Sequence, residues 1–226
     1  LNADKMRTYY RDMMIRNLAA VKYMKTLPQW DGKGLEVAGG SQGGYQAIVV
    51  AAHDKDVTFV DVYIPWFCDI NGSNHGYIKS LWVPKFQDGL RYFDCVAHGM
   101  QLKCPIKILA YSGDFTCPPS TVMALYNSIK APKHLEMVQA GTHGYRPPER
   151  IGYHLVEGNE LKIGKYRHYK GGEYTVLDVG YHSETCEETV IYQSAVNGKI
   201  WVRPQWMFCE FVNIKGIPQE RFTYIG

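Results

Sequence analysis

A glycine-rich hexapeptide restricts the fold of this chain more than any other stretch. Residues 39–44 read GGSQGG, residues 35–38 before them have the pattern of a short strand, and residues 45–52 after them have the pattern of a small-residue helix. Glycines at such a turn let the strand and the helix approach closely and allow a strained backbone. The stretch predicts a strand, a sharp turn and a helix, although a glycine-rich turn without chemistry fits these six residues equally well.

Strand and helix patterns alternate on both sides of this turn. The expected elements are a helix at 6–27, strands at 57–64, 105–111 and 134–138, a helix at 121–129, and a mixed stretch at 67–103 where a lid could lie. Alternating strands and helices pair in parallel through right-handed crossovers. We therefore predict an α/β domain with a parallel sheet and flanking helices over residues 1–150.

The pattern changes near residues 150–159, where we place a domain boundary. No helical period follows, and short strands are expected at 173–179, 188–194, 199–202, 207–213 and 221–225. Asn197-Gly198 is a strong signal for a hairpin with a type I′ turn. Short strands with regular turns predict a small all-β, barrel-like domain over residues 159–226.

Composition excludes several classes of function. The chain is 46% hydrophobic and 21% charged with a net charge of +3, which is ordinary for a globular protein. We expect no nucleic-acid partner and no membrane span. The six cysteines form no Cys-x-x-Cys pair and no cluster with histidines in sequence, so the sequence predicts neither a zinc site nor a disulfide framework. The chain begins with Leu1 and carries no signal-peptide pattern, so we expect the native N-terminus upstream, and the compartment stays open.

Three residues follow successive predicted strands in the order serine, aspartate, histidine. They are Ser41, Asp114 and His143. A serine hydroxyl needs a base to take its proton and a carboxylate to orient that base, and this order is the one used by α/β-hydrolases. Alternatives remain open: Asp69 could be the acid, Asp114 a helix-capping residue, and His143 an ordinary loop histidine.

Three motifs together resemble the acetyl xylan esterase and cephalosporin-C deacetylase family, over about residues 9–148. They are GGSQGG, SGDFTCPPST with VMALYNSIKAPK after it, and GTHG. The resemblance implies that Ser41 is the nucleophile, Asp114 the acid and His143 the base, with the N–H of Gln42 as an oxyanion donor. Family members remove acetyl groups from xylose-containing saccharides and related small esters, and this chemistry requires no metal and no organic cofactor.

The chain departs from this family in two ways. Gly144 follows the histidine where the family commonly has glutamate. Only residues 1–34 precede the strand of the elbow, as we call the strand, turn and helix around Ser41, and they are too few for the strands expected there. The second oxyanion donor comes from a loop in that part of the fold, and loss of one donor typically lowers the rate by about 100- to 1000-fold. We therefore expect a partial α/β-hydrolase, its N-terminal strands missing, that is weakly active or inactive by itself.

Four aromatic residues of the irregular stretch are candidates for the acyl or sugar pocket, with lid packing as the alternative: Trp66, Phe67, Tyr77 and Trp82. The end of the chain, about residues 160–226, is similar to a small bacterial domain family with no assigned function. Its aromatic and charged positions form either a ligand- or peptide-binding face or only a core and rim: Tyr166, His168, Tyr169, Tyr174, Trp201, Arg203 and Trp206.

The leading hypothesis is a serine esterase that deacetylates acetylated xylo-saccharides or similar small acetyl esters. Its expected partner is a small acetyl ester or an acetylated oligosaccharide, and a homo-oligomer is compatible with the sequence. A prolyl-oligopeptidase-like serine peptidase would share the same order of residues. A non-catalytic binding protein on a hydrolase remnant is the third hypothesis.

Overall fold

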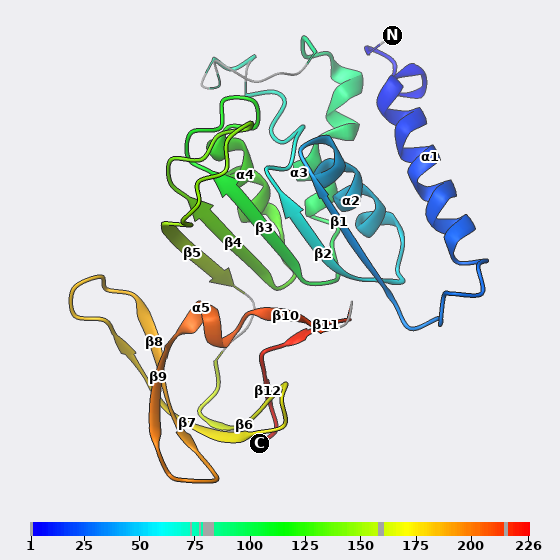
Figure 1. Cartoon of the computed structure of the whole chain (residues 1–226). Coiled ribbons are helices and arrows are strands. Elements are labelled where there is room, and N and C mark those ends of the chain that lie inside the picture. The colour runs from blue at the N-terminus through cyan, green and yellow to red at the C-terminus, as the bar shows by residue number, and fades with distance from the viewer. Residues whose placement is uncertain (1, 73, 77, 79–83, 158–160, 215–216) are drawn as a thin grey trace. The chain divides into compact units, whose positions relative to one another are not determined.

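The computed structural model describes residues 2–72, 74–76, 78, 84–157, 161–214 and 217–226 (Figure 1). The chain divides into two compact units, Leu1–Gly158 and Asn159–Gly226. Each unit has its own cluster of buried hydrophobic side chains. No helix in the described ranges is long and apolar enough to cross a membrane.

The first unit is built on a five-stranded sheet. Its strands, in spatial as well as chain order, are β1 (Leu35–Gly40), β2 (Val57–Tyr63), β3 (Ile106–Tyr111), β4 (Lys133–Val138) and β5 (Gly152–Glu157). The first four strands pair in parallel and β5 pairs antiparallel to β4. The predicted α/β class is thus confirmed. Parallel pairing brings the C-terminal ends of β1, β3 and β4 to one edge of the sheet, where their loops can form a site.

Some helices of the unit pack directly on the sheet and others pack on those helices. The α-helices of the unit are α1 (Tyr9–Met24), α2 (Gln42–His53), α3 (Cys95–Gly99) and α4 (Pro119–Ser128), with 3-10 turns η1 (Lys5–Arg7) and η2 (Asp88–Phe93). Helix α2 packs on β1 and β2, α4 packs on β3, and α1 lies against α2. Pro119 opens α4, in keeping with the preference of proline for the first turn of a helix.

Helix α1 is fixed to the rest of the unit at both ends. Near its start, the ring of Tyr10 stacks on the buried ring of Phe67 with centroids 4.3 Å apart. Past its end, the ammonium of Lys25 pairs with Asp54 and, at 2.8 Å, with Asp56 in the turn between α2 and β2. These contacts explain why a helix with a modest apolar stripe holds its place.

The helix predicted at 6–27 is longer than α1, and the last strand of the sheet was not predicted. Helix α1 begins at Tyr9 rather than at residue 6, because the Thr8 side chain accepts the N–H of Arg11 and caps it there. Strand β5 lies inside the stretch expected to be a boundary. Its pairing with β4 is a tertiary contact that a single-sequence pattern does not reveal.

The second unit is an antiparallel sheet with a separate hairpin, which confirms the all-β class. Its elements are β6 (Gly164–His168), β7 (Glu173–Tyr181), β8 (Glu188–Ser194), β9 (Ile200–Pro204), α5 (Gln205–Phe208), β10 (Phe211–Ile214), β11 (Ile217–Glu220) and β12 (Phe222–Tyr224). The sheet order is β12-β6-β7-β8-β9, and β10 pairs with β11. In its core Phe208 stacks on Phe222 with ring centroids 4.0 Å apart.

Two local predictions in this unit were wrong. The strand expected at 207–213 is interrupted, because α5 forms a helical turn that buries Phe208 in the core before β10 begins. The β8–β9 hairpin exists, but its turn is not type I′. Gly198 has a φ of 66° while Asn197 does not take a positive φ, and a type I′ turn requires both. Instead the Asn197 carboxamide accepts the N–H of Lys199 at 3.1 Å.

Candidate active site

Ser41 sits on a strained turn between β1 and α2. Its backbone has φ 52° and ψ −118°, a conformation that residues with a side chain rarely adopt and that persists only where the surroundings enforce it. Here the Ser41 N–H donates to the carbonyl of Tyr63 at 3.0 Å, and its carbonyl accepts the N–H groups of Tyr45 at 3.1 Å and Trp66 at 3.0 Å. The loop after β2 therefore holds the serine in place.

The glycines of the elbow are required by close backbone contacts. A Cβ on Gly39 would lie 2.5 Å from both carbonyl atoms of Gly43, and a Cβ on Gly40 would overlap the ring of Tyr63. The first of these obstacles is backbone, which cannot move aside without displacing α2. The hexapeptide thus has the local geometry that its glycines predict.

The N-terminus of α2 begins directly after the serine. Gln42 is the first residue of the helix, so its backbone N–H has no acceptor within the helix. Its side-chain amide donates instead to the sulfur of Met13 in α1 at 3.2 Å. The backbone N–H, rather than the side chain, is thus the group of Gln42 that suits an anion beside Ser41.

Asp114 follows β3 and is fixed by three hydrogen-bonding partners. Its residue exposure is 1%. One carboxylate oxygen accepts the N–H groups of Thr116 and Cys117, both at 2.8 Å. The other lies 3.0 Å from Nδ1 of His143. These contacts hold the carboxylate in one orientation, pointed at the imidazole.

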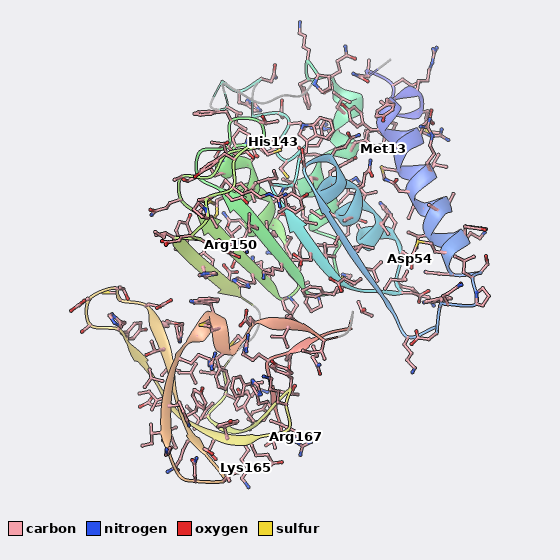
Figure 2. All side chains as sticks on the ribbon, viewed as in Figure 1. Met13, Asp54, His143, Arg150, Lys165 and Arg167 are labelled. Atoms are coloured by element: carbon pink, nitrogen blue, oxygen red, sulfur yellow. The ribbon has the colours of Figure 1, made fainter. Side chains whose placement is uncertain are left out.

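His143 lies in the loop after β4, at the edge of the sheet where β1 runs into α2 (Figure 2). About a third of its side chain, 33%, is exposed. The carbonyl of Gly141 accepts the N–H of Gly113 at 3.0 Å, so the loops that carry Asp114 and His143 are joined directly. With Nδ1 facing Asp114, the other ring nitrogen is free to act on a substrate or a nucleophile.

Cys117 is the residue of this site that the sequence analysis did not single out. Its buried thiol sulfur lies 4.0 Å from Oγ of Ser41. Burial, with a smaller contribution from the Asp114 carboxylate, raises the pKa of the thiol to about 12. Because only the thiolate is strongly nucleophilic, Cys117 is a poor rival to Ser41 as the attacking group. The sequence signal that could have identified Cys117 is its position in the SGDFTCPPST motif, three residues after Asp114.

The other candidate residues that the structure describes, Asp69 and two of the four aromatic residues, do not join Ser41, Asp114 and His143 in this site. Asp69 follows β2, but the carboxylate that contacts His143 is that of Asp114. Trp66 is 7% exposed and Phe67 is fully buried, and both rings pack against Tyr10 and Tyr45 in the core. Both rings are therefore packed in the core and do not line an open pocket. Tyr77 and Trp82 lie outside the described residues.

Two family models match the chain. The model of the acetyl xylan esterase family matches residues 1–74 and 85–151. A second model, described only as a protein of unknown function (DUF1653), matches residues 164–224. The curated acetyl esterase Axe7A of Xylanibacter ruminicola is 32% identical over 149 residues, which is 62% of this chain and 34% of that protein. This chain therefore spans about a third of its relative's length.

Solved structures of acetyl xylan esterases share the fold of the first unit. The enzyme from Paenibacillus sp. R4 matches with a TM-score of 0.58 and 23% identity, over 64% of this chain and 51% of that one. Acetyl xylan esterase 1 from Thermoanaerobacterium sp. JW/SL YS485 matches with a TM-score of 0.54 and 21% identity over the same shares of both chains. At this identity the likeness establishes the fold.

Proposed function

We propose, from the premise that this chain belongs to the acetyl xylan esterase family, that its first unit carries the catalytic machinery of a serine carboxylic-ester hydrolase. Ser41 is the nucleophile, His143 the general base and Asp114 the orienting acid. One observation carries the proposal most strongly: the buried Asp114 carboxylate contacts His143 at 3.0 Å beside a serine on a strained elbow. Nucleophile, base and orienting group within one loop cluster are what acyl transfer requires.

The first half of the reaction acylates the serine. His143 takes the Ser41 proton through Nε2 as Oγ attacks the acetyl carbonyl carbon. Negative charge develops on the carbonyl oxygen, and the backbone N–H of Gln42 at the start of α2 stabilises it. The tetrahedral intermediate collapses, the C–O bond to the sugar breaks, and the sugar oxygen leaves with the proton from His143.

The second half returns the enzyme to its starting state. Water gives a proton to His143 and attacks the acetyl–Ser41 ester, again through an oxyanion. Collapse releases acetate and returns the proton to Oγ. Asp114 accepts from two backbone N–H groups and lies 3.0 Å from Nδ1 of His143, so it holds the imidazole in the tautomer with Nε2 free.

The substrates proposed are acetylated xylo-saccharides and similar small acetyl esters. The support is the matched family and the activity in the relatives' names. The chain covers 34% of the length of Axe7A and 51% of that of the Paenibacillus enzyme.

A fluorophosphonate probe tests the nucleophile, since it reacts with activated serines. We expect labelling of the purified chain at Ser41, loss of labelling in Ser41→Ala, and unchanged labelling in Ser120→Ala, an exposed serine in the first turn of α4. Labelling that survives Ser41→Ala, or no labelling even after the long incubation that a weakly active chain requires, would contradict the proposed triad.

Substrate competition tests the reaction class. Acetate release from an acetylated xylo-oligosaccharide should exceed cleavage of a prolyl-peptide anilide at equal concentration, and both should be lost in Ser41→Ala. The reverse preference would favour a serine peptidase that uses the same residues.

A further inference from the structure

The thiol of Cys117 lies near the side chain of each member of the proposed triad. Besides its 4.0 Å contact with Oγ of Ser41, its sulfur belongs to a cluster with a carboxylate oxygen of Asp114 and a ring nitrogen of His143. These three atoms all lie within 4.8 Å of one another. Acyl transfer has no step for a thiol here, so the cluster is not explained by the proposed function.

The three donors form a set that selects one class of ion. Imidazole nitrogen, carboxylate oxygen and thiolate sulfur are the ligands of zinc, whereas calcium and magnesium prefer oxygen alone. Zinc sites that keep an open fourth position also use three protein ligands. The Oγ of Ser41 or a water molecule would take that fourth position.

We propose that Asp114, Cys117 and His143 bind a thiophilic divalent metal ion, zinc being the physiological ion that fits them best, and that the bound ion inhibits the site. The binding stands on the cluster alone. The inhibition rests on the proposed esterase function, because it requires that His143 be the catalytic base.

The geometry needs only a small adjustment to close around an ion. With bonds of about 2.0 Å to nitrogen and about 2.3 Å to sulfur, ligand atoms in a tetrahedral site lie about 3.5 Å apart. Asp114 and His143 already approach to 3.0 Å. Asp114 also accepts the N–H of Cys117 at 2.8 Å, so two of the ligands share one tight turn. His143 is the partly exposed member, with 33% of its side chain exposed.

Charge neutrality favours a dication in this place. A carboxylate and a thiolate together carry two negative charges, which cancel those of the ion, so the buried site would hold no net charge. A thiol that coordinates a metal ion is deprotonated outright. The proton leaves to solvent as the metal–sulfur bond forms.

The bound ion would stop acyl transfer for a direct reason. It would engage the imidazole that has to accept the Ser41 proton and would occupy the space beside Oγ. The sequence does not reveal this site, because Cys117 and His143 are far apart in the chain and match no metal-binding spacing. They meet only because β3 and β4 are neighbours in the sheet.

Cobalt titration tests the binding without any need for esterase activity. Reduced, chelator-treated chain is titrated with CoCl2, and the cobalt–thiolate charge-transfer absorption is followed in the near ultraviolet. We expect one equivalent to bind and ZnCl2 to displace it. The absorption should vanish in Cys117→Ser and persist in Cys104→Ser, a buried thiol outside the cluster, and in Cys186→Ser, an exposed one.

A second variant keeps the test decisive if Cys117→Ser does not fold, which a thermal melt would show. His143→Ala changes a partly exposed loop residue and should weaken cobalt binding by more than about 10-fold, the lower end of the loss seen even for residues that only support a ligand. Absorption that survives Cys117→Ser, or its absence from the wild-type chain, overturns the site.

Inhibition is measured separately by fluorophosphonate labelling. Zinc at one equivalent should block labelling of Ser41, and a chelator should restore it. If the wild-type chain shows the cobalt absorption but is labelled equally with and without zinc, the inhibition is wrong and the binding site stands. If it is never labelled, the proposed esterase function fails instead.

Discussion

Nδ1 of His143 lies 3.0 Å from a carboxylate oxygen of Asp114 whose side chain is completely buried. The contact joins the loop after β3 to the loop after β4, and the other oxygen of the same carboxylate is held by two backbone N–H groups. The imidazole is therefore oriented by a group that cannot itself turn away. The consequences can be measured one residue at a time.

Asp114→Asn should lower kcat/KM for p-nitrophenyl acetate by roughly 10²- to 10⁴-fold, because the amide no longer stabilises the imidazolium or fixes its tautomer. The fold should survive, since the remaining carbonyl oxygen can still accept the N–H groups of Thr116 and Cys117. Asp12→Asn, an exposed carboxylate on α1, is the control. An unchanged rate in Asp114→Asn would remove this residue from the site.

Gly39→Ala should destabilise the chain by about 1–3 kcal/mol, because its Cβ would lie 2.5 Å from backbone atoms of Gly43. Gly43→Ala is the matched control in the same hexapeptide. Its Cβ meets nothing within 4 Å, and alanine in a helix is favoured over glycine by up to about 1 kcal/mol. Urea unfolding of the two variants should shift in opposite directions, and equal shifts would argue against the close packing of β1 on α2.

His98 should make stability depend on pH. Burial, with the neighbouring His53, lowers its pKa from the ordinary 6.5 to about 4, and within the described chain neither ring nitrogen has a hydrogen-bond partner. The unfolded chain therefore binds a proton more readily, so this contribution is complete above about pH 6.5 and is lost as the pH falls toward 4. His98→Leu should flatten the fall in melting temperature between pH 7 and pH 4.5. Gln101→Leu, a nearby exposed position, should leave it as steep as in the wild type.

Lys25→Met should cost about 1–2 kcal/mol of stability, since it leaves the partly buried Asp54 and Asp56 without their shared cation. The loss should appear as a lower urea midpoint. Lys22→Met, exposed in the last turn of α1, should change the free energy of unfolding by less than about 0.5 kcal/mol. Equal effects of the two variants would mean that the ion pair contributes no more than a surface charge.

Much of this arrangement could be predicted from sequence because it depends on order along the chain. Alternating strands and helices bring the ends of β1, β3 and β4 to one edge, which is why Ser41, Asp114 and His143 could be chosen without coordinates. The prediction of their chemical roles still awaits the experiments above. The glycine spacing likewise predicted the tight elbow.

Other features depend on contacts that a linear pattern does not carry. Strand β5 forms because its backbone pairs with the free edge of β4. Helix α5 forms because this turn places Phe208 in the core of the second unit. The approach of Cys117 to Ser41 depends on how Asp114 folds its own loop, through hydrogen bonds to two N–H groups further along the chain. A side-chain direction set by such a turn cannot be read from residue types alone.

Strand β1 has one further consequence. Among the strands that the structure describes, it pairs only with β2, so one row of its backbone groups has no strand beside it. Segments with few partners open locally at a lower free energy than the whole molecule. Ser41 directly follows this strand. Transient opening of β1 would therefore displace the serine from the site and remove its reactivity, while the remaining sheet stayed intact. Heating should then abolish fluorophosphonate reactivity several degrees before circular dichroism reports melting.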